Sequence, residues 1–272
     1  MNMKYKKNIT ITVVCLSLLI AACASEQKLH ESQFLQWHYA GTVPLDTELR
    51  GDSPRLEVTM SLLQMRYPPE QAKFLNNVLY FSDDFNEYKD RVIRRQRENY
   101  RVMFPALENT GGEDSASFDW RYTENIIAGN TENMGIVVER VVDTYTGGAH
   151  GLVTKRYYVI DLDSHRLINI DDIFQDFQGE KTRAIVYSEL RNYSGLAEDQ
   201  PLSEGIYLSD EPELSSNFFV SQEGVGLRWD PYEITPYYAG GIDIIIPWKK
   251  IRPLLLHSGM ELLTKFNIYL FI

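Results

Sequence analysis

The chain has 272 residues, with 27 basic and 38 acidic side chains and a formal net charge of −11 at pH 7. A negative charge of this size disfavours binding to nucleic acid or to anionic lipid headgroups, and it suits a basic partner. The hydrophobic fraction of 44% is ordinary for a globular chain, so a disordered or fibrous protein is not expected.

The first residues have the three parts of a bacterial export signal. Lysines precede the short apolar run 9–20, and two alanines precede Cys23. The run is shorter than the ~20 residues that a membrane-spanning helix needs. Because Ile-Ala-Ala-Cys resembles a bacterial lipobox, we expect residues 1–22 to be removed and residues 23–33 to form a tether lipidated at Cys23. The alternative is a plain signal peptide cut beside a chance cysteine.

Cleavage would change the chemistry of the chain. Cys15 would leave with the signal peptide and Cys23 would carry lipid, so no thiol would remain for a disulfide. The mature chain would have 24 basic and 38 acidic residues, a net charge of −14. We expect a cell-envelope protein held to its membrane by lipid. Ala24, in place of an aspartate, favours the outer membrane facing the periplasm over the inner membrane.

The first predicted elements after the tether are a strand and a helix. Apolar and polar residues alternate at 56–62, which predicts a half-buried strand. Prolines 68 and 69 then open a helix, and apolar residues recur at helical spacing from 74 to about 100. This part, residues 34–114, is expected to form an N-terminal strand–helix subdomain.

The sequence pattern of the following part, residues 115–272, predicts mainly strands. A helix is predicted at 180–191, between the third and fourth of these strands. The stretches rich in β-branched and aromatic residues are 118–122, 135–143, 155–162, 217–221, 226–229 and 242–246. The order of elements predicts an α+β fold, with a mostly antiparallel sheet on which one long helix and short helices pack.

Two segments carry the strongest functional signal. The first is Tyr145–Gly151 (YTGGAHG), and the second is Trp229–Gly240 (WDPYEITPYYAG). Together they resemble the C-terminal domain of the RsiV-type family, the extracytoplasmic domain of a bacterial anti-sigma factor that senses lysozyme. Similar domains occur in bacterial lipoproteins and beside peptidoglycan deacetylases. The resemblance covers roughly residues 115–256 and implies a ligand-binding domain, but the sequence offers no spanning helix for signalling to a sigma factor.

The glycine–histidine segment has a structural and a chemical interpretation. Gly147, Gly148 and Gly151 allow a tight connection with positive φ and a close approach of backbones. His150 would be fixed beside this connection, either as a hydrogen-bonding brace or as a ligand or catalytic base, and we favour the brace. None of the five histidines pairs with another at metal-ligand spacing, so neither a metal site nor a cofactor is expected.

The aromatic segment and an acidic loop are the candidate ligand-binding residues. Tyr232, Tyr237 and Tyr238 lie close to Pro236, as in a recognition surface, although a packed edge over the core is equally compatible. The loop 196–216 contains six acids and no Lys or Arg. Its candidate residues are Glu198, Asp199, Asp210, Glu211 and Glu213.

Three functions remain open. The first is an extracytoplasmic binding protein that captures a basic cell-wall enzyme, such as a lysozyme-like muramidase, and has no catalytic residues of its own. The second is an enzyme that acts on peptidoglycan or another glycan through paired carboxylates. The third is a structural envelope lipoprotein. A shallow aromatic surface rimmed by acids would favour the first, and a deep pocket with two converging buried carboxylates would favour the second.

Overall fold

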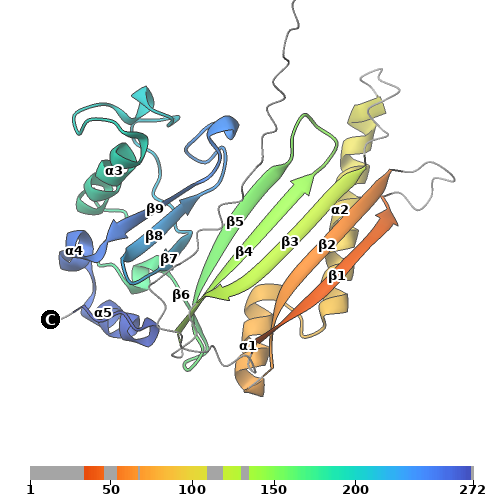
Figure 1. Ribbon diagram of the computed structural model, residues 1–272, viewed down its shortest axis with the longest axis horizontal. Helices are drawn as coiled ribbons and strands as arrows, with labels where there is room; N and C mark the ends of the chain where they lie inside the picture. The colour runs from red at the N-terminus through yellow and green to blue at the C-terminus, as the bar shows by residue number, and fades with distance from the viewer. Residues whose placement is uncertain (1–33, 46–53, 67, 109–118, 130–134, 271–272) are drawn as a thin grey trace, which may run out of the picture. The chain divides into compact units, whose positions relative to one another are not determined.

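Two sheets organise the described part of the chain, which comprises residues 34–45, 54–66, 68–108, 119–129 and 135–270 of a computed structural model. The larger sheet has the order β1-β2-β3-β4-β5-β6, and the smaller has the order β7-β8-β9 (Figure 1). The strands are β1 (Phe34–Pro44), β2 (Arg55–Met65), β3 (Trp120–Gly129), β4 (Gly135–Tyr145), β5 (Leu152–Asp161), β6 (Arg166–Ile168), β7 (Phe218–Val220), β8 (Gly224–Trp229) and β9 (Ile242–Pro247). The predicted α+β class with mostly antiparallel pairing is confirmed.

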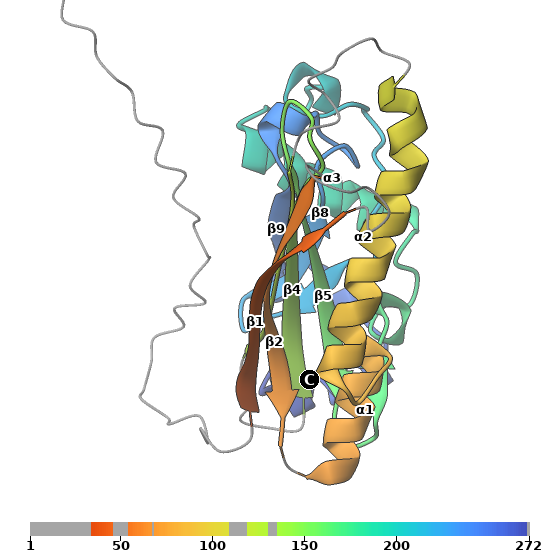
Figure 2. The same cartoon turned by 90° about the vertical axis from the view of Figure 1, so that its right-hand side faces the viewer.

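One pair of neighbouring strands, β2 and β3, is parallel. The helices α1 (Pro69–Tyr80) and α2 (Phe85–Glu108) lie between them in the chain, as a parallel crossover requires. Figure 2 shows α2 running along one face of the larger sheet. Both expected subdomains therefore contribute strands to one sheet. The predicted boundary at residue 114 lies outside the described residues and stays a prediction, as do the signal peptide and the lipidated Cys23.

The single helix that the sequence predicts from residue 68 to about 100 is two helices, α1 and α2. The prediction of a continuous helix is therefore wrong. Phe81 adopts a left-handed conformation with φ of 52°, and its N–H donates to the carbonyl of Asn77, which ends α1. The carboxylate of Asp84 then accepts from the N–H of Asn86 at 2.8 Å and caps the next helix. Tyr80 and Phe85 both point into the core, with ring centroids 5.1 Å apart. The apolar spacing therefore continues across the break.

Two apolar clusters form the core. One lies between the larger sheet and helices α1 and α2, where Tyr100 packs edge-on against Trp120 at 5.5 Å. The other surrounds β8 and β9. It is covered by α3 (Glu180–Ser194), α4 (Trp248–Ile251) and α5 (His257–Leu263). The helix predicted at 180–191 is confirmed, with Val186 and Leu190 fully buried. The described residues contain no helix long and apolar enough to span a membrane.

Side chains join the two sheets where β5 has a free edge. Strand β6 pairs with β5 only from Val159 onward. Before that point, Asn217 accepts from the N–H of Tyr157 at 2.8 Å and donates to the carbonyl of Lys155 at 2.7 Å. Asp230 accepts from the N–H of Lys155 at 2.9 Å. These bonds satisfy the backbone of β5 as a paired strand would. They also place the loop after β8 close to the connection between β4 and β5.

Candidate functional site

The connection between β4 and β5 needs glycine at two of its three glycine positions. Gly147 has φ of 81°, in the left-handed region. At Gly151 a Cβ would lie 2.7 Å from the carbonyl oxygen of Thr144, too close for any side chain. Gly148 lies outside the left-handed region, and a Cβ there would meet only the carbonyl oxygen of His150, at 4.0 Å. The expected requirement for glycine therefore concentrates on Gly147 and Gly151.

The two segments singled out in the sequence meet in a stack of rings. The His150 ring lies on the Tyr237 ring, with centroids 3.6 Å apart and planes 16° apart. Tyr232 also stacks with Tyr237, at 5.8 Å and 28°. The Tyr237 hydroxyl donates to the carbonyl of Gly151 at 2.8 Å, across 86 residues of sequence. His150 is exposed, and its Nδ1 lies 3.1 Å from the same carbonyl. His150 thus contacts the loop through its stacked ring and Nδ1 and keeps part of the ring available to solvent.

The loop 230–240 leaves two of its three tyrosines mostly exposed, and the third, Tyr237, is half-buried. Tyr232 has φ of 75°, which is uncommon for a residue with a side chain. Its N–H donates to the carbonyl of Thr235 at 2.9 Å, and the buried Thr235 hydroxyl donates to the carbonyl of Gly240 at 2.7 Å. Tyr232 is 57% exposed and Tyr238 is 82% exposed. We call His150, Tyr232, Tyr237 and Tyr238 the aromatic surface.

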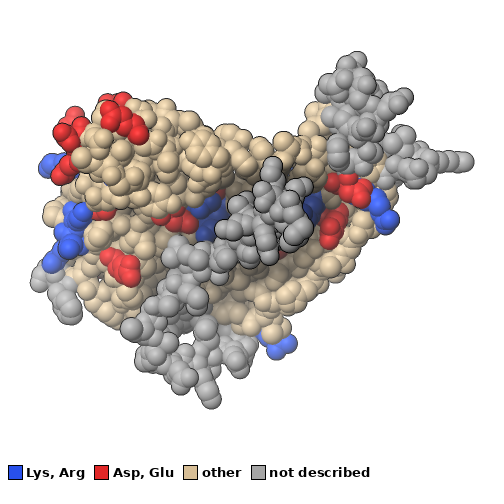
Figure 3. Space-filling model, turned by 45° about the horizontal axis from the view of Figure 1, so that its top comes forward, with Lys and Arg blue, Asp and Glu red and all other residues tan. Residues whose placement is uncertain are grey.

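The acidic loop 196–216 borders the aromatic surface. The N–H of Leu208 donates to the carbonyl of Ile234 at 2.9 Å, and Trp229 Nε1 donates to the carbonyl of Glu213 at 2.9 Å. The five candidate acids, Glu198, Asp199, Asp210, Glu211 and Glu213, are all exposed. In Figure 3, acidic side chains gather over the part of the molecule that contains α3 and this loop.

One of these acids is fixed within the loop. The N–H of Ser203 donates to the Asp210 carboxylate at 2.8 Å and lowers the pKa of that carboxyl. Asp210 therefore remains charged at neutral pH. Pro236 is half-buried and starts the short turn that carries Tyr237 and Tyr238.

A second polar cluster, which the sequence did not reveal, lies beneath α2. Glu124 is 1% exposed and its Oε1 is 2.7 Å from Arg140 Nε. Its carboxylate also accepts from the hydroxyls of Tyr88 at 2.7 Å and Tyr122 at 2.9 Å. Burial, and then the charge of Glu124, raise the pKa of both tyrosines above their ordinary range. Burial alone would lower the pKa of Arg140, but the charge of Glu124 outweighs it and the pKa is raised. We call these four residues the buried network.

Carboxylates elsewhere near the sheet junction are held by cations. Arg228 contacts Asp230 at 3.0 Å and Asp243 at 3.2 Å, and Lys155 lies 3.4 Å from Asp243. These acids therefore serve as ion-pair partners at the junction. Among the described residues, no group of three His, Cys, Asp or Glu side chains could hold a metal ion.

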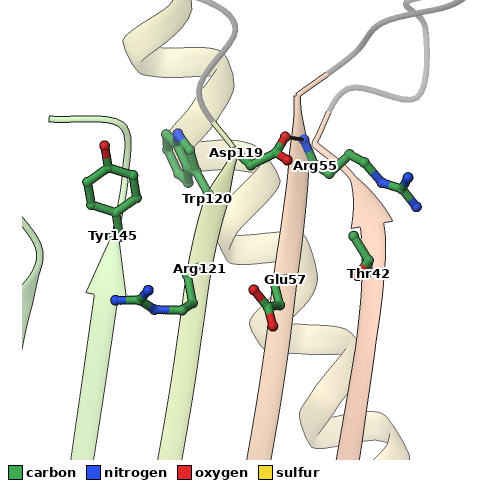
Figure 4. A pocket seen from close by; sticks show the side chains of 7 residues that line it. All are labelled: Thr42, Arg55, Glu57, Asp119, Trp120, Arg121 and Tyr145. Atoms are coloured by element: carbon green, nitrogen blue, oxygen red, sulfur yellow. Dashed lines mark hydrogen bonds between the residues drawn. The ribbon is translucent and has the colours of Figure 1, made fainter.

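An open cavity of about 360 Å³ lies at the ends of four neighbouring strands (Figure 4). Thr42, Glu57, Arg121 and Tyr145 come from β1, β2, β3 and β4 and form a row across one face of the sheet. The charged residues that line the cavity are two bases, Arg55 and Arg121, and two acids, Glu57 and Asp119. Arg121 also lies 3.4 Å from Asp143. Nothing in this row singles out a catalytic pair.

The fold is similar to known structures, and part of the sequence matches a family. Residues 171–249, which include the acidic loop and the aromatic loop, match the family described as "Protein of unknown function (DUF3298)". A crystal structure of a DUF3298 family member from Bacteroides fragilis NCTC 9343 has a TM-score of 0.69 at 20% identity. The similarity covers 83% of this chain and 94% of the chain in that crystal structure. A DUF3298 family protein from Pseudomonas aeruginosa PAO1 has a TM-score of 0.55 at 14% identity, with coverages of 83% and 95%. At these identities the likeness shows the fold.

A curated relative is similar in sequence over part of the chain. The peptidoglycan-N-acetylmuramic acid deacetylase PdaC of Bacillus subtilis strain 168 is 30% identical over 114 residues, which are 41% of this chain and 24% of the relative. The chain thus spans about a quarter of the length of that relative. These matches concern the DUF3298 family and a deacetylase, so the resemblance to the RsiV-type family stays a prediction.

Proposed function

We propose that this chain is an extracytoplasmic binding protein of the bacterial cell envelope, and that its aromatic surface captures a basic cell-wall enzyme such as a lysozyme-like muramidase. The observation that carries the proposal is the stack of His150, Tyr237 and Tyr232, in which two distant segments build one exposed surface. A role of this kind needs no cofactor and no catalytic residue.

The geometry of the rings supports tight contact. Tyr237 is fixed by stacking on His150 and by its bond to Gly151, and the Tyr232 ring stacks with Tyr237. Rings held in place before binding lose little conformational entropy when a partner covers them. Tyrosine adds a hydroxyl to a large apolar area, which suits interfaces. The affinity is therefore expected to come from Tyr232, Tyr237 and Tyr238.

The acidic loop supports the choice of a basic partner. Its five exposed candidate acids follow α3 and lead back to the aromatic loop. Exposed charges mainly accelerate the encounter, and salt screens them over ~8 Å at physiological strength. We expect added salt to slow association more than it speeds dissociation.

The envelope location rests on the export signal and on the relative. The relative's name states that it acts on the N-acetylmuramic acid of peptidoglycan, which favours a cell-wall context for this chain as well. Within this proposal, Cys23 carries lipid and holds the domain to a membrane, with the outer membrane preferred. Replacing Cys23 by Ala should release the protein from the membrane fraction or leave it unprocessed.

A peptidoglycan-acting enzyme is the second candidate, and the name of the relative is the observation that favours it. An enzyme that cleaves glycosidic bonds would need two carboxylates that converge in a pocket. The buried carboxylate of Glu124 is engaged by Arg140 and two tyrosines. Turnover of purified peptidoglycan by the chain, lost on replacing a single acid, would support the enzyme over the binding protein.

The binding proposal is tested by dissociation rates. Surface-plasmon resonance with a basic muramidase should show faster dissociation for Tyr237→Ala, because the central ring of the stack is lost. Tyr269→Ala is the matched control, since Tyr269 is 60% exposed and lies outside the aromatic surface. Equal dissociation rates for the two variants would show that the partner does not use these rings.

A further inference from the structure

An open cleft of about 460 Å³ lies between α2 and the ends of β4 and β5. Its size is within the ~300–1,000 Å³ typical of small-molecule sites. The cleft exists because α2 covers only part of this face of the sheet. Tyr100 of α2 is buried in the core, whereas Arg95 and Asn99 are exposed on the flank of the helix and line the cleft together with the buried Gln96.

The cleft gathers more positive charge than its surroundings neutralise. Arg140 on β4 and Arg156 on β5 are direct partners across the antiparallel pair, so they lie on the same face of the sheet. Like charges in this position are unfavourable unless something bridges them. Arg140 is neutralised by Glu124, at 2.7 Å. In the described part of the chain, no carboxylate forms an ion pair with Arg156 or with Arg95.

This distribution is unusual for the molecule. The chain has a net charge of −11, and the cavity lined by Glu57 and Arg121 balances its charges. The cleft beneath α2 is lined by Arg95, Arg140, Lys155 and Arg156, against Asp230 alone. Lys155 and Asp230 are already held in the ion pairs of the sheet junction. Arg95 and Arg156, which have no ion-pair partner among the residues that the structure describes, therefore both line one cavity.

The rest of the lining is rich in neutral hydrogen-bonding groups. Thr144, Thr154 and Asn99 contribute hydroxyl and amide groups from three different elements. Guanidinium groups bind carboxylates and phosphates through paired, charge-assisted hydrogen bonds. Hydroxyls and amides match the hydroxyls of a sugar.

We propose that this cleft binds a small acidic sugar, with its carboxylate or phosphate between Arg95 and Arg156. The site uses none of the rings of the aromatic surface, so it does not depend on capture of a muramidase. Its chemistry requires an anionic group together with hydroxyl groups on one small molecule.

Calorimetric titration of the purified full chain tests the proposal. The probes are N-acetylmuramic acid for the carboxylate, glucose 6-phosphate for the phosphate, N-acetylglucosamine as the neutral sugar and inorganic phosphate as the anion without a sugar. At least one acidic sugar should bind, with the neutral sugar and inorganic phosphate each about tenfold weaker or more, since charge-assisted hydrogen bonds exceed neutral ones. Comparing the two acidic sugars decides between carboxylate and phosphate.

Variants locate the binding. Arg156→Gln should weaken the acidic sugar about tenfold or more, by loss of a charge-assisted bond. Arg94→Gln is the matched control, because Arg94 is exposed on α2 next to Arg95 but does not line the cleft. The control should change affinity by less than about twofold. Thermal unfolding of each variant verifies the fold.

Several results would overturn the proposal. One is the absence of binding by either acidic sugar at about 10 mM, where even a weak site of this kind would be partly filled. Another is binding of N-acetylglucosamine or inorganic phosphate as tight as that of the better acidic sugar. The third is equal weakening by Arg94→Gln and Arg156→Gln, which would indicate attraction by general surface charge.

Discussion

Two clusters of tyrosines and charged or polar groups serve different ends in this molecule. In the buried network, Glu124 engages Tyr88, Tyr122 and Arg140, and both carboxylate oxygens are occupied. In the aromatic surface His150, Tyr237 and Tyr232 stack, but Tyr232 and Tyr238 remain mostly exposed. Similar residue types are thus packed beneath α2 in the buried network and exposed to solvent in the aromatic surface. Burial and free ring area, more than residue type, separate the buried network from the aromatic surface.

The two clusters should also respond differently to substitution. Glu124 is 1% exposed, and removing its charge leaves Arg140 without the partner that compensates its partial burial, which is strongly destabilising. Removing an exposed ring leaves a surface that water can cover. The comparison therefore predicts large losses of stability in the buried network and, in the aromatic surface, losses of binding with the fold preserved.

The largest expected effect is at Glu124. Glu124→Gln removes the negative charge that compensates Arg140 and should lower the free energy of unfolding by about 3–5 kcal/mol. Denaturant unfolding measures this directly. Glu57→Gln, on the exposed face of β2, is the control and should change stability by less than about 0.5 kcal/mol. Equal losses in the two variants would contradict the role given to the buried network.

The next effect concerns the hairpin that carries His150. Gly147→Val places a β-branched residue at φ of 81° and should lower the free energy of unfolding by about 1–3 kcal/mol. Gly148→Val should cost less, because a side chain there has room and an ordinary backbone. Thermal unfolding of both variants checks the order. If Gly148→Val proves the more harmful, the hairpin geometry described here is wrong.

A smaller, pH-dependent effect is expected at the turn after β5. Burial would raise the pKa of the Asp161 carboxyl, but hydrogen bonds from Lys265 and Ser164 outweigh it, and the pKa is lowered below the ordinary 3.8. A lowered folded-state pKa stabilises the fold above the ordinary value, and the contribution is lost as the pH falls through the folded value. Asp161→Asn should therefore be less stable than the parent chain at pH 7, with a difference that shrinks below pH 3.8. A difference that grows on acidification would contradict this assignment.

The smallest effect on stability is expected in the acidic loop. Replacing Glu211 and Glu213 by Gln should leave thermal unfolding unchanged, since both side chains are exposed. The association rate with a basic muramidase should fall at low salt and converge on that of the parent chain at high salt, because salt screens exposed charges. A change confined to the dissociation rate would place these acids in the desolvated contact instead.

Local patterns predicted elements well and partners poorly. The alternation at 56–62 identified β2, and the helical spacing at 180–191 identified α3. Strand β1 was not predicted, although Trp37, Tyr39 and Val43 point to the same side as one another. The parallel pairing of β2 with β3 also escaped prediction. Periodicity reports which residues face inward, whereas pairing depends on contacts between distant segments.

The site illustrates the same limit. The sequence singled out His150 and Tyr237 separately, but nothing local indicates that their rings stack. Arg140 lies opposite Arg156 because of the register between β4 and β5, and the length of the hairpin sets that register. Glu124 offered one signal that could have been used, because it occupies an inward position of an alternating strand.

Direct binding tests the central claim most plainly. Calorimetric titration of the chain with animal-type lysozymes and other basic muramidases should give saturable binding by at least one of them, weakened in Tyr237→Ala while thermal unfolding shows that the variant is folded. No detectable binding to any of several muramidases at about 100 μM, where even a dissociation constant in the upper micromolar range would register, would contradict the proposal that the aromatic surface captures such an enzyme.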